Sequence, residues 1–321
     1  MTPPRLPFPD GKRFAFTIFD DTDVATVENV RPVYRLLEEL GFRTTKTAWP
    51  HSWSGGRSDF SSSETLEDPD YRDFVVDLKQ RGFEIASHGA SFETSSREQT
   101  LTAMERFREL FGGYPRLHAN HAYNRENLYW GTNRLDDPLL RAVYRRIDGH
   151  PDGYYSGHIP GSPYWWGDFA ERHVEYVRNL TFAEINLLSV NPSMPYHDPQ
   201  RPLVRGWFSA CDAEGAEEFA ELFREEQQER LESEGGVCIV STHLGKGHGA
   251  NGAMHAGARR ALESLAKRPG WFPTVGELLD WLRGLRSDDR LPAREWKAMQ
   301  WRWARDLAAR KARRRWKRFD W

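Results

Sequence analysis

The sequence predicts a (β/α) barrel, distorted or seven-stranded, that is followed by a basic helical extension. Short runs rich in β-branched and aromatic residues alternate with longer segments whose apolar residues recur every three or four positions. About seven strand-like runs form one continuous series, which favours a closed barrel over a flat doubly wound sheet. No glycine-rich phosphate loop follows any of them, which disfavours a dinucleotide-binding fold. We expect the barrel over residues 1–288 and the extension over residues 289–321.

The predicted elements alternate in a regular order, with a Ser/Gly-rich insertion at 52–63 between the second strand and its helix. The strand-like runs are FAFTIF (14–19), RTTKTAW (43–49), FEIASHG (83–89), RLHAN (116–120), DGYYSGH (152–158), PLVRGWFSA (202–210) and VCIVSTH (237–243). The helical segments are 29–42, 71–83, 97–114, 136–147, 168–180, 217–236, 257–268 and 275–285. Most strands lead directly into a helix, so we expect parallel βα units.

The composition excludes several other classes of protein. With 321 residues, 39% hydrophobic and 29% charged, the chain can bury a large core and is not of the disordered class. Its two cysteines, Cys211 and Cys238, make no disulfide framework and no CxxC motif, so a reducing compartment is expected. The N-terminus has no apolar run typical of a signal peptide, and no segment approaches the length of a membrane-spanning helix. We therefore expect a cytoplasmic protein.

Acidic and imidazole side chains recur where the predicted strands end. Asp20, Asp21 and Asp23 follow the first strand, and five of the 11 histidines follow later ones. These histidines are His88, His118, His121, His158 and His243. Because the carboxyl ends of parallel strands carry the chemistry of barrel enzymes, we expect these groups to converge, although a single histidine is more often structural.

Carboxylate and imidazole together are the ligands of Zn²⁺ and related divalent ions. A bound dication would offset the repulsion within the acidic cluster and lower the pKa of a bound water from about 15.7 toward 7. We therefore predict a divalent metal, with zinc favoured and nickel, cobalt or manganese as alternatives. For Asp23, which precedes VATVENV, we favour an N-cap of the following helix.

Three of these segments resemble motifs of the polysaccharide deacetylase family, carbohydrate esterases that share the NodB homology domain. FDD at 19–21, the histidine of EIASHGAS and the strand IVSTH carry the resemblance, which covers roughly residues 12–285. The resemblance implies an incomplete (β/α) barrel that uses a divalent metal to hydrolyse acetyl groups from sugars. It further implies Asp20 as general base, Asp21 and His88 as metal ligands, and His243 as general acid.

The sequence departs from the family pattern at two places. Phe92 stands where the family has its second metal histidine, and His118 in LHANHAYN stands where the family has an arginine. We infer that the third metal ligand has moved to the fourth strand, where either His118 or His121 supplies it. The segments HANH, GHIPGSPYWWGD and STHLGKG resemble a divergent branch associated with surface-polysaccharide biosynthesis.

Aromatic residues in two loops are candidates for sugar binding. Trp130, Trp165 and Trp166 lie beside glycines and prolines after the fourth and fifth predicted strands. Such rings commonly stack on the apolar face of a sugar, and packing beneath the loops is the equal alternative. We assign His158, at the end of the fifth predicted strand, to the same substrate site.

The C-terminal segment is strongly basic. Residues 294–320 contain 11 Lys/Arg and 3 Asp/Glu, a local charge of +8, so that the remainder carries −10. Its apolar residues lie mostly at helical spacing and are Trp296, Met299, Trp303, Leu307, Trp316 and Phe319. Two interpretations stay open: a helix packed on the barrel, or a helix that contacts the inner membrane surface. The acidic remainder argues against nucleic-acid binding.

These observations predict a metal-dependent hydrolase that removes an acetyl or related acyl group from an amino sugar or polysaccharide precursor. One alternative is a catalytically silent barrel that binds glycan or partner enzymes in a polysaccharide assembly complex, which Phe92 motivates. Another retains the metal but cleaves a different amide or ester bond.

Overall fold

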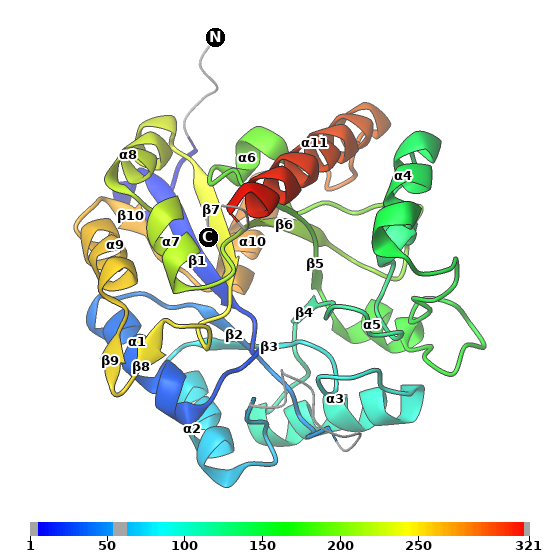
Figure 1. Ribbon diagram of the computed structural model, residues 1–321, viewed down its shortest axis with the longest axis horizontal. Helices are drawn as coiled ribbons and strands as arrows, with labels where there is room; N and C mark the ends of the chain where they lie inside the picture. Colours follow the sequence, from blue (N-terminus) through cyan, green and yellow to red (C-terminus); the bar gives the residue numbers. More distant parts are fainter. Residues whose placement is uncertain (1–5, 54–62, 318–321) are drawn as a thin grey trace.

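The computed structural model describes residues 6–53 and 63–317, with side chains described as far as residue 312. Seven parallel strands form a barrel in chain order, and β7 pairs with β1 to close it (Figure 1). The strands are β1 (Phe14–Asp20), β2 (Thr45–Ala48), β3 (Glu84–Ser87), β4 (Leu117–Ala119), β5 (Tyr176–Phe182), β6 (Trp207–Asp212) and β7 (Val237–Thr242). The predicted seven-stranded (β/α) barrel is therefore confirmed.

The helices surround this barrel (Figure 1). They are α1 (Val27–Glu39), α2 (Pro69–Gln80), α3 (Arg97–Phe111), α4 (Pro138–Asp148), α5 (Gly167–His173), α6 (Leu187–Val190), α7 (Ala216–Leu222), α8 (Glu225–Glu234), α9 (Ala256–Ala266), α10 (Val275–Gly284) and α11 (Ala293–Lys317). Short pieces complete the fold: 3-10 helices η1 (Pro9–Gly11) and η2 (Gly131–Arg134), a hairpin of β8 (Gly249–Ala250) and β9 (Ala253–Met254), and β10 (Gly270–Trp271) beside β1.

The two faces of β1 point into different layers of the core. Phe16 packs its ring against Phe42 and Phe223 in the helical layer. Phe19 points to the opposite face and packs against Phe208 of β6. Because side chains alternate along a strand, Asp20 lies on the helical side and Asp21 on the barrel side.

The fifth strand differs from the prediction. Residues 152–158 form turns and bends, and the strand lies instead at Tyr176–Phe182, which overlaps the end of the segment 168–180 that we predicted to be helical. Arg178 and Asn179 interrupt the apolar pattern of this buried strand, which hides it from a reading based on periodicity. The helix predicted at 217–236 is also two helices, separated at Phe223 and Arg224.

Thr26, and not Asp23, caps α1. The Thr26 hydroxyl accepts the backbone N–H of Asn29, and the Asn29 side chain accepts the backbone N–H of Thr26. This reciprocal pair satisfies two of the free N–H groups at the helix start. The capping role that we favoured for Asp23 is therefore wrong, and its carboxylate is available for another role.

The C-terminal helix α11 packs on the barrel beside β5 and α4 (Figure 1). Trp296, Met299 and Trp303 are buried, as the packing interpretation predicts, whereas Phe319 lies outside the described residues. Arg310 fixes the helix to the barrel through an ion pair with Asp212 of β6. Among the described residues, no helix has the length and apolar character that crossing a membrane requires.

Candidate metal centre and active site

A pocket of about 330 Å³ opens at the C-terminal ends of the strands. Its ionisable lining follows β1, β3, β4 and β7 in the chain and consists in part of Asp21, Asp23, His88, His121 and His243. Arg178 of β5 and Trp303 of α11 also line the pocket. Two of the three carboxylates and three of the five histidines that we expected to converge thus lie in this pocket, and the C-terminal helix completes its lining.

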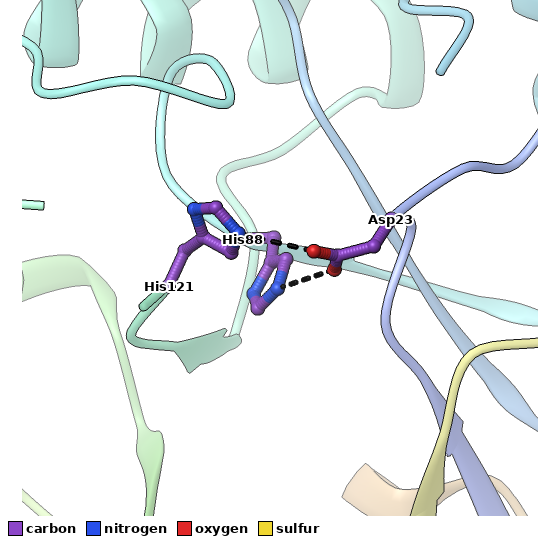
Figure 2. A group of neighbouring side chains, drawn as sticks. All are labelled: Asp23, His88 and His121. Carbon is purple, nitrogen blue, oxygen red and sulfur yellow. Dashed lines mark hydrogen bonds and ion pairs between the residues drawn. The ribbon is translucent and has the colours of Figure 1, made fainter. Parts of the chain in front are cut away.

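Three buried side chains lie together in this pocket (Figure 2). Nε2 of His121 lies 3.1 Å from Oδ1 of Asp23, and Nε2 of His88 lies 3.3 Å from Oδ2 of the same carboxylate. One ligand atom from each residue lies within 4.8 Å of the other two. Among the described residues, this is the group whose geometry could hold a metal ion.

The hydrogen bonds of His88 orient the ring for ligation. Nδ1 lies 3.1 Å from the carbonyl oxygen of Ala119, which can only accept, so Nδ1 carries the proton. In the neutral ring Nε2 then presents its lone pair to Asp23. Metal-binding histidines commonly donate their second N–H to a carbonyl in this way.

The cluster contains polar atoms without hydrogen-bond partners among the described residues. Oδ2 of Asp23 accepts no hydrogen bond, and Nδ1 of His121 is buried without a partner in the described part of the chain. Burial acts to raise the pKa of Asp23, but the hydrogen bond from His121 and the adjacent His88 ring hold that pKa well below its usual range. A carboxylate oxygen that faces an imidazole lone pair needs a proton or a metal ion between them, and one carboxylate with two imidazoles is a donor set that fits a divalent ion.

His243 reaches the same carboxylate from β7. Its Nδ1 lies 2.9 Å from the carbonyl oxygen of Glu214 and therefore carries the proton in the neutral ring. Its Nε2 lies 3.6 Å from Oδ2 of Asp23. The ring can therefore exchange a proton with the pocket only through Nε2.

Asp21 lines the pocket but binds a guanidinium. Its two oxygens each accept a hydrogen bond of 2.8 Å from Arg178, and Ser241 donates to Oδ2 at 3.2 Å. Burial acts to raise the pKa of Asp21, but the Arg178 guanidinium and the nearby His88 and His243 rings together outweigh burial and lower that pKa. This carboxylate is therefore a fixed anion beside the cluster and not one of its three members.

Asp20 does not line the pocket, because it lies on the helical side of β1. One oxygen accepts hydrogen bonds from Lys46 at 3.0 Å and from the Tyr34 hydroxyl at 2.8 Å. The other accepts the backbone N–H of Leu244 at 2.9 Å. The structure thus places the predicted general base in a fully buried ion pair on the far side of the strand.

Two predicted site histidines also lie outside the lining of the pocket. His118 is buried, with Nδ1 3.2 Å from the Ser87 hydroxyl and its ring against Trp166. Burial lowers the pKa of His118 to about 3, so the ring is neutral. Nδ1 of His158 accepts the backbone N–H of Tyr129, and burial lowers the pKa of His158 to about 4.

Of the three predicted sugar-binding tryptophans, Trp130 lines the pocket. Trp166 is buried and donates its indole N–H to the carbonyl of Glu126, which matches the packing alternative. Trp165 accepts a hydrogen bond from Arg97 through its carbonyl and does not line the pocket. Phe92, at the position of the missing histidine, packs its ring against His121 and Trp49 behind the cluster.

The fold is similar to that of solved structures described as polysaccharide deacetylases. A polysaccharide deacetylase assigned in Mycobacterium smegmatis superposes with a TM-score of 0.52 at 15% identity, over 90% of this chain and 96% of that one. A second, from Pseudomonas aeruginosa, gives a TM-score of 0.50 at 13% identity, over 88% and 95%. The chain has the polysaccharide deacetylase fold. No protein-family model and no curated protein matches the sequence.

Within this deacetylase fold, the pocket residues that the sequence did not assign to the site include Asp23 as a member of the cluster, Arg178 and Arg134. Arg178 carried a detectable signal, because a charged residue inside an otherwise buried strand needs a partner. The signal for Asp23 was weaker. Residues two apart in an extended chain lie on the same side, so the spacing places Asp23 on the side of Asp21.

Proposed function

We propose that this protein is a metal-dependent hydrolase that removes an acetyl or related acyl group from an amino sugar or polysaccharide precursor. The observation that carries the proposal is the buried cluster of Asp23, His88 and His121, in which His88 is oriented as a ligand, beside Asp21 and His243 in one pocket. The shared fold with polysaccharide deacetylases supports the sugar substrate.

We assign the metal to Asp23, His88 and His121, with zinc as the favoured ion. A bound divalent ion would polarise the acyl carbonyl and increase the acidity of water in the pocket. This assignment moves the carboxylate ligand from Asp21 to Asp23, because Asp21 is not one of the three residues whose ligand atoms lie within 4.8 Å of one another. It takes His121 rather than His118, because His118 does not line the pocket.

The two remaining roles belong to groups on either side of the cluster. Asp21, held as an anion by Arg178, would accept the proton of the attacking water. His243 can exchange a proton only at Nε2, and in its protonated form would donate that proton to the leaving amine. Asp21 therefore takes the role of general base that the sequence assigned to Asp20.

Metal removal tests this function. We expect purified protein to hold about one equivalent of a divalent ion, and dialysis against a chelator to lower acetate release from N-acetylated sugars by about 100-fold or more. Zinc, cobalt, nickel or manganese added back one at a time should restore turnover and identify the preferred ion. Full turnover at less than about 0.2 equivalents of metal would contradict the proposal, and a metal-free protein that binds glycan without cleaving it would support the silent barrel.

We also propose that the protein contacts the inner membrane surface through α4 and α11. Exposed cations on α11 are Arg294, Lys297, Arg302, Arg305 and Lys311. On the adjoining α4, Leu139, Val143 and Ile147 are 59%, 47% and 46% exposed and lie one helical turn apart. Lys311 lies at the groove between the two helices together with Val143 and Ile147, so apolar and basic groups share one surface. This combination favours binding to anionic lipid.

Vesicle sedimentation measures this contact. We expect the protein to bind vesicles with anionic lipid and not neutral ones, and binding to fall as salt rises. The variant Val143→Ser/Ile147→Ser should bind several-fold more weakly, because it removes the apolar part of the surface. Leu285→Ser, at an exposed apolar residue after α10, is the control and should bind as wild type does. Equal binding of all three proteins would rule out α4 as the contact.

A further inference from the structure

Arg134 is a buried cation without an acidic partner in the described part of the chain. It ends the short helix η2, is 5% exposed and lines the same pocket as the Asp23 cluster. Its Nη2 donates to the Tyr144 hydroxyl at 3.2 Å, and its Nε is buried with no hydrogen-bond partner. No carboxylate of the described residues lies within 4.0 Å of its guanidinium. A guanidinium cannot lose its proton at neutral pH, so the charge remains.

Neighbouring acids have other partners. Asp136 pairs with Arg201, and Asp137 accepts the first N–H groups of α4 and the indole N–H of Trp301. Asp148, which lies beside Gly131, accepts the Tyr155 hydroxyl and faces His150. None of these carboxylates neutralises Arg134 through an ion pair.

The other charges that line the pocket are paired. Arg178 binds Asp21, and Arg310 binds Asp212. Glu214 pairs with Lys246 outside the lining, and Asp23 faces the histidines. Among the described residues of the lining, Arg134 is thus the arginine that lacks a carboxylate. A buried charge with no counter-charge destabilises the folded protein, so its position at a binding pocket indicates that a ligand supplies the anion.

Aromatic rings hold the guanidinium in place. Its central carbon lies 3.7 Å from the centre of the Trp130 ring, with Trp303 at 5.2 Å and Tyr144 at 5.5 Å. Stacking on these rings orients the planar group within the lining of the pocket. Trp303 belongs to α11, so this arrangement depends on the C-terminal helix.

We propose that Arg134 binds an anionic substituent of the substrate, a phosphate or a carboxylate, while Trp130 packs against the sugar. The proposal rests on the proposed function, since it names the class of sugar that the same pocket takes. A planar guanidinium with parallel N–H donors matches both anions. The substrate would thus be an N-acylated amino sugar that carries a negative group beside the acyl group.

Paired substrates test the proposal. We expect wild type to hydrolyse N-acetylglucosamine 1-phosphate or an N-acetylated sugar acid with a kcat/KM about 10- to 100-fold above that for neutral N-acetylglucosamine. Arg134→Met should remove that ratio, and Arg134→Lys should restore part of it, since lysine keeps the charge without the planar fork. Arg146→Met, on the exposed surface of α4, is the matched control and should keep the wild-type ratio. The anion that gives the larger ratio identifies the source.

Calorimetric titration of N-acetylglucosamine 1-phosphate separates this proposal from the proposed function. If wild type binds this sugar phosphate without hydrolysing it, and Arg134→Met does not bind it, the anion site is supported and the proposed hydrolase activity is rejected. Turnover with equal kcat/KM for charged and neutral sugars, or a ratio that persists in Arg134→Met, would overturn the anion site. Arg134→Met should unfold at a temperature equal to or above that of wild type, because it removes an unpaired buried charge.

Discussion

Asp23→Asn should deprive the protein of its metal and lower hydrolysis by about 1000-fold or more, whereas Asp21→Asn should lower hydrolysis comparably and keep the metal. The difference follows from the partners of the two carboxylates. Asp23 faces the Nε2 atoms of His88 and His121 at 3.3 and 3.1 Å, so its carboxylate is part of the three-residue cluster that we propose as the metal site. Asp21 binds Arg178 and would act on the water proton, which an amide cannot accept.

Metal content by elemental analysis, zinc titration of chelator-treated protein, and kcat measure the two effects separately. Asp212→Asn is a suitable control, because it removes a carboxylate from the same pocket that pairs with Arg310 and lies outside the cluster. It should keep metal at wild-type stoichiometry. Loss of metal in Asp21→Asn together with retention in Asp23→Asn would return the ligand role to Asp21, as the sequence resemblance implied.

Asp20→Asn should destabilise the protein by about 3 to 5 kcal/mol, in place of the selective loss of catalysis that a general base predicts. Asp20 and Lys46 form a 3.0 Å ion pair whose side chains are both 0% exposed. Burial acts to lower the pKa of Lys46, but Asp20 and Tyr71 together outweigh burial and raise that pKa above 10.5. Because the folded-state pKa is the higher one, the stabilisation is present at neutral pH and would be lost only in strongly alkaline solution.

Chemical denaturation measures this change, and the melting temperature should fall by about 5 to 8 °C. The double variant Asp20→Asn/Lys46→Met should recover much of the loss, because it removes the unpaired ammonium as well. Lys46→Met alone should also be destabilising, since it leaves the buried Asp20 carboxylate without its counter-charge. If Asp20→Asn melts as wild type does, retains metal and loses turnover, then Asp20 is the base and the assignment to Asp21 fails.

Local patterns predicted much of the barrel and failed where a partner is distant in the sequence. The strands β1, β2, β3, β4 and β7 lie within or overlap the runs where we predicted them. β5 carries Arg178, whose partner Asp21 lies 157 residues earlier in the chain. Periodicity is a property of neighbouring residues, so it cannot show that a charge in a strand is neutralised from across the barrel.

The site shows the same division. His88, His121 and His243 follow strands, and their position in the sequence was enough to expect them in one pocket. The roles within the acidic cluster depend on which side of β1 each residue faces. Both faces of that strand are buried, so the hydrophobic pattern could not separate Asp20 from Asp21. Ala122 adopts φ 36°, a turn immediately after His121 that the sequence did not reveal.

The origin of the cluster along the chain bears on how the molecule is made. Asp23, His88 and His121 all belong to the first four βα units, whereas the pairing of β7 with β1 must wait for synthesis of the last strand. During translation, these three residues are synthesised before β7, and therefore before the barrel can close. An ion captured at that stage would join three loops of the incomplete protein and serve as an assembly template as well as a reaction centre.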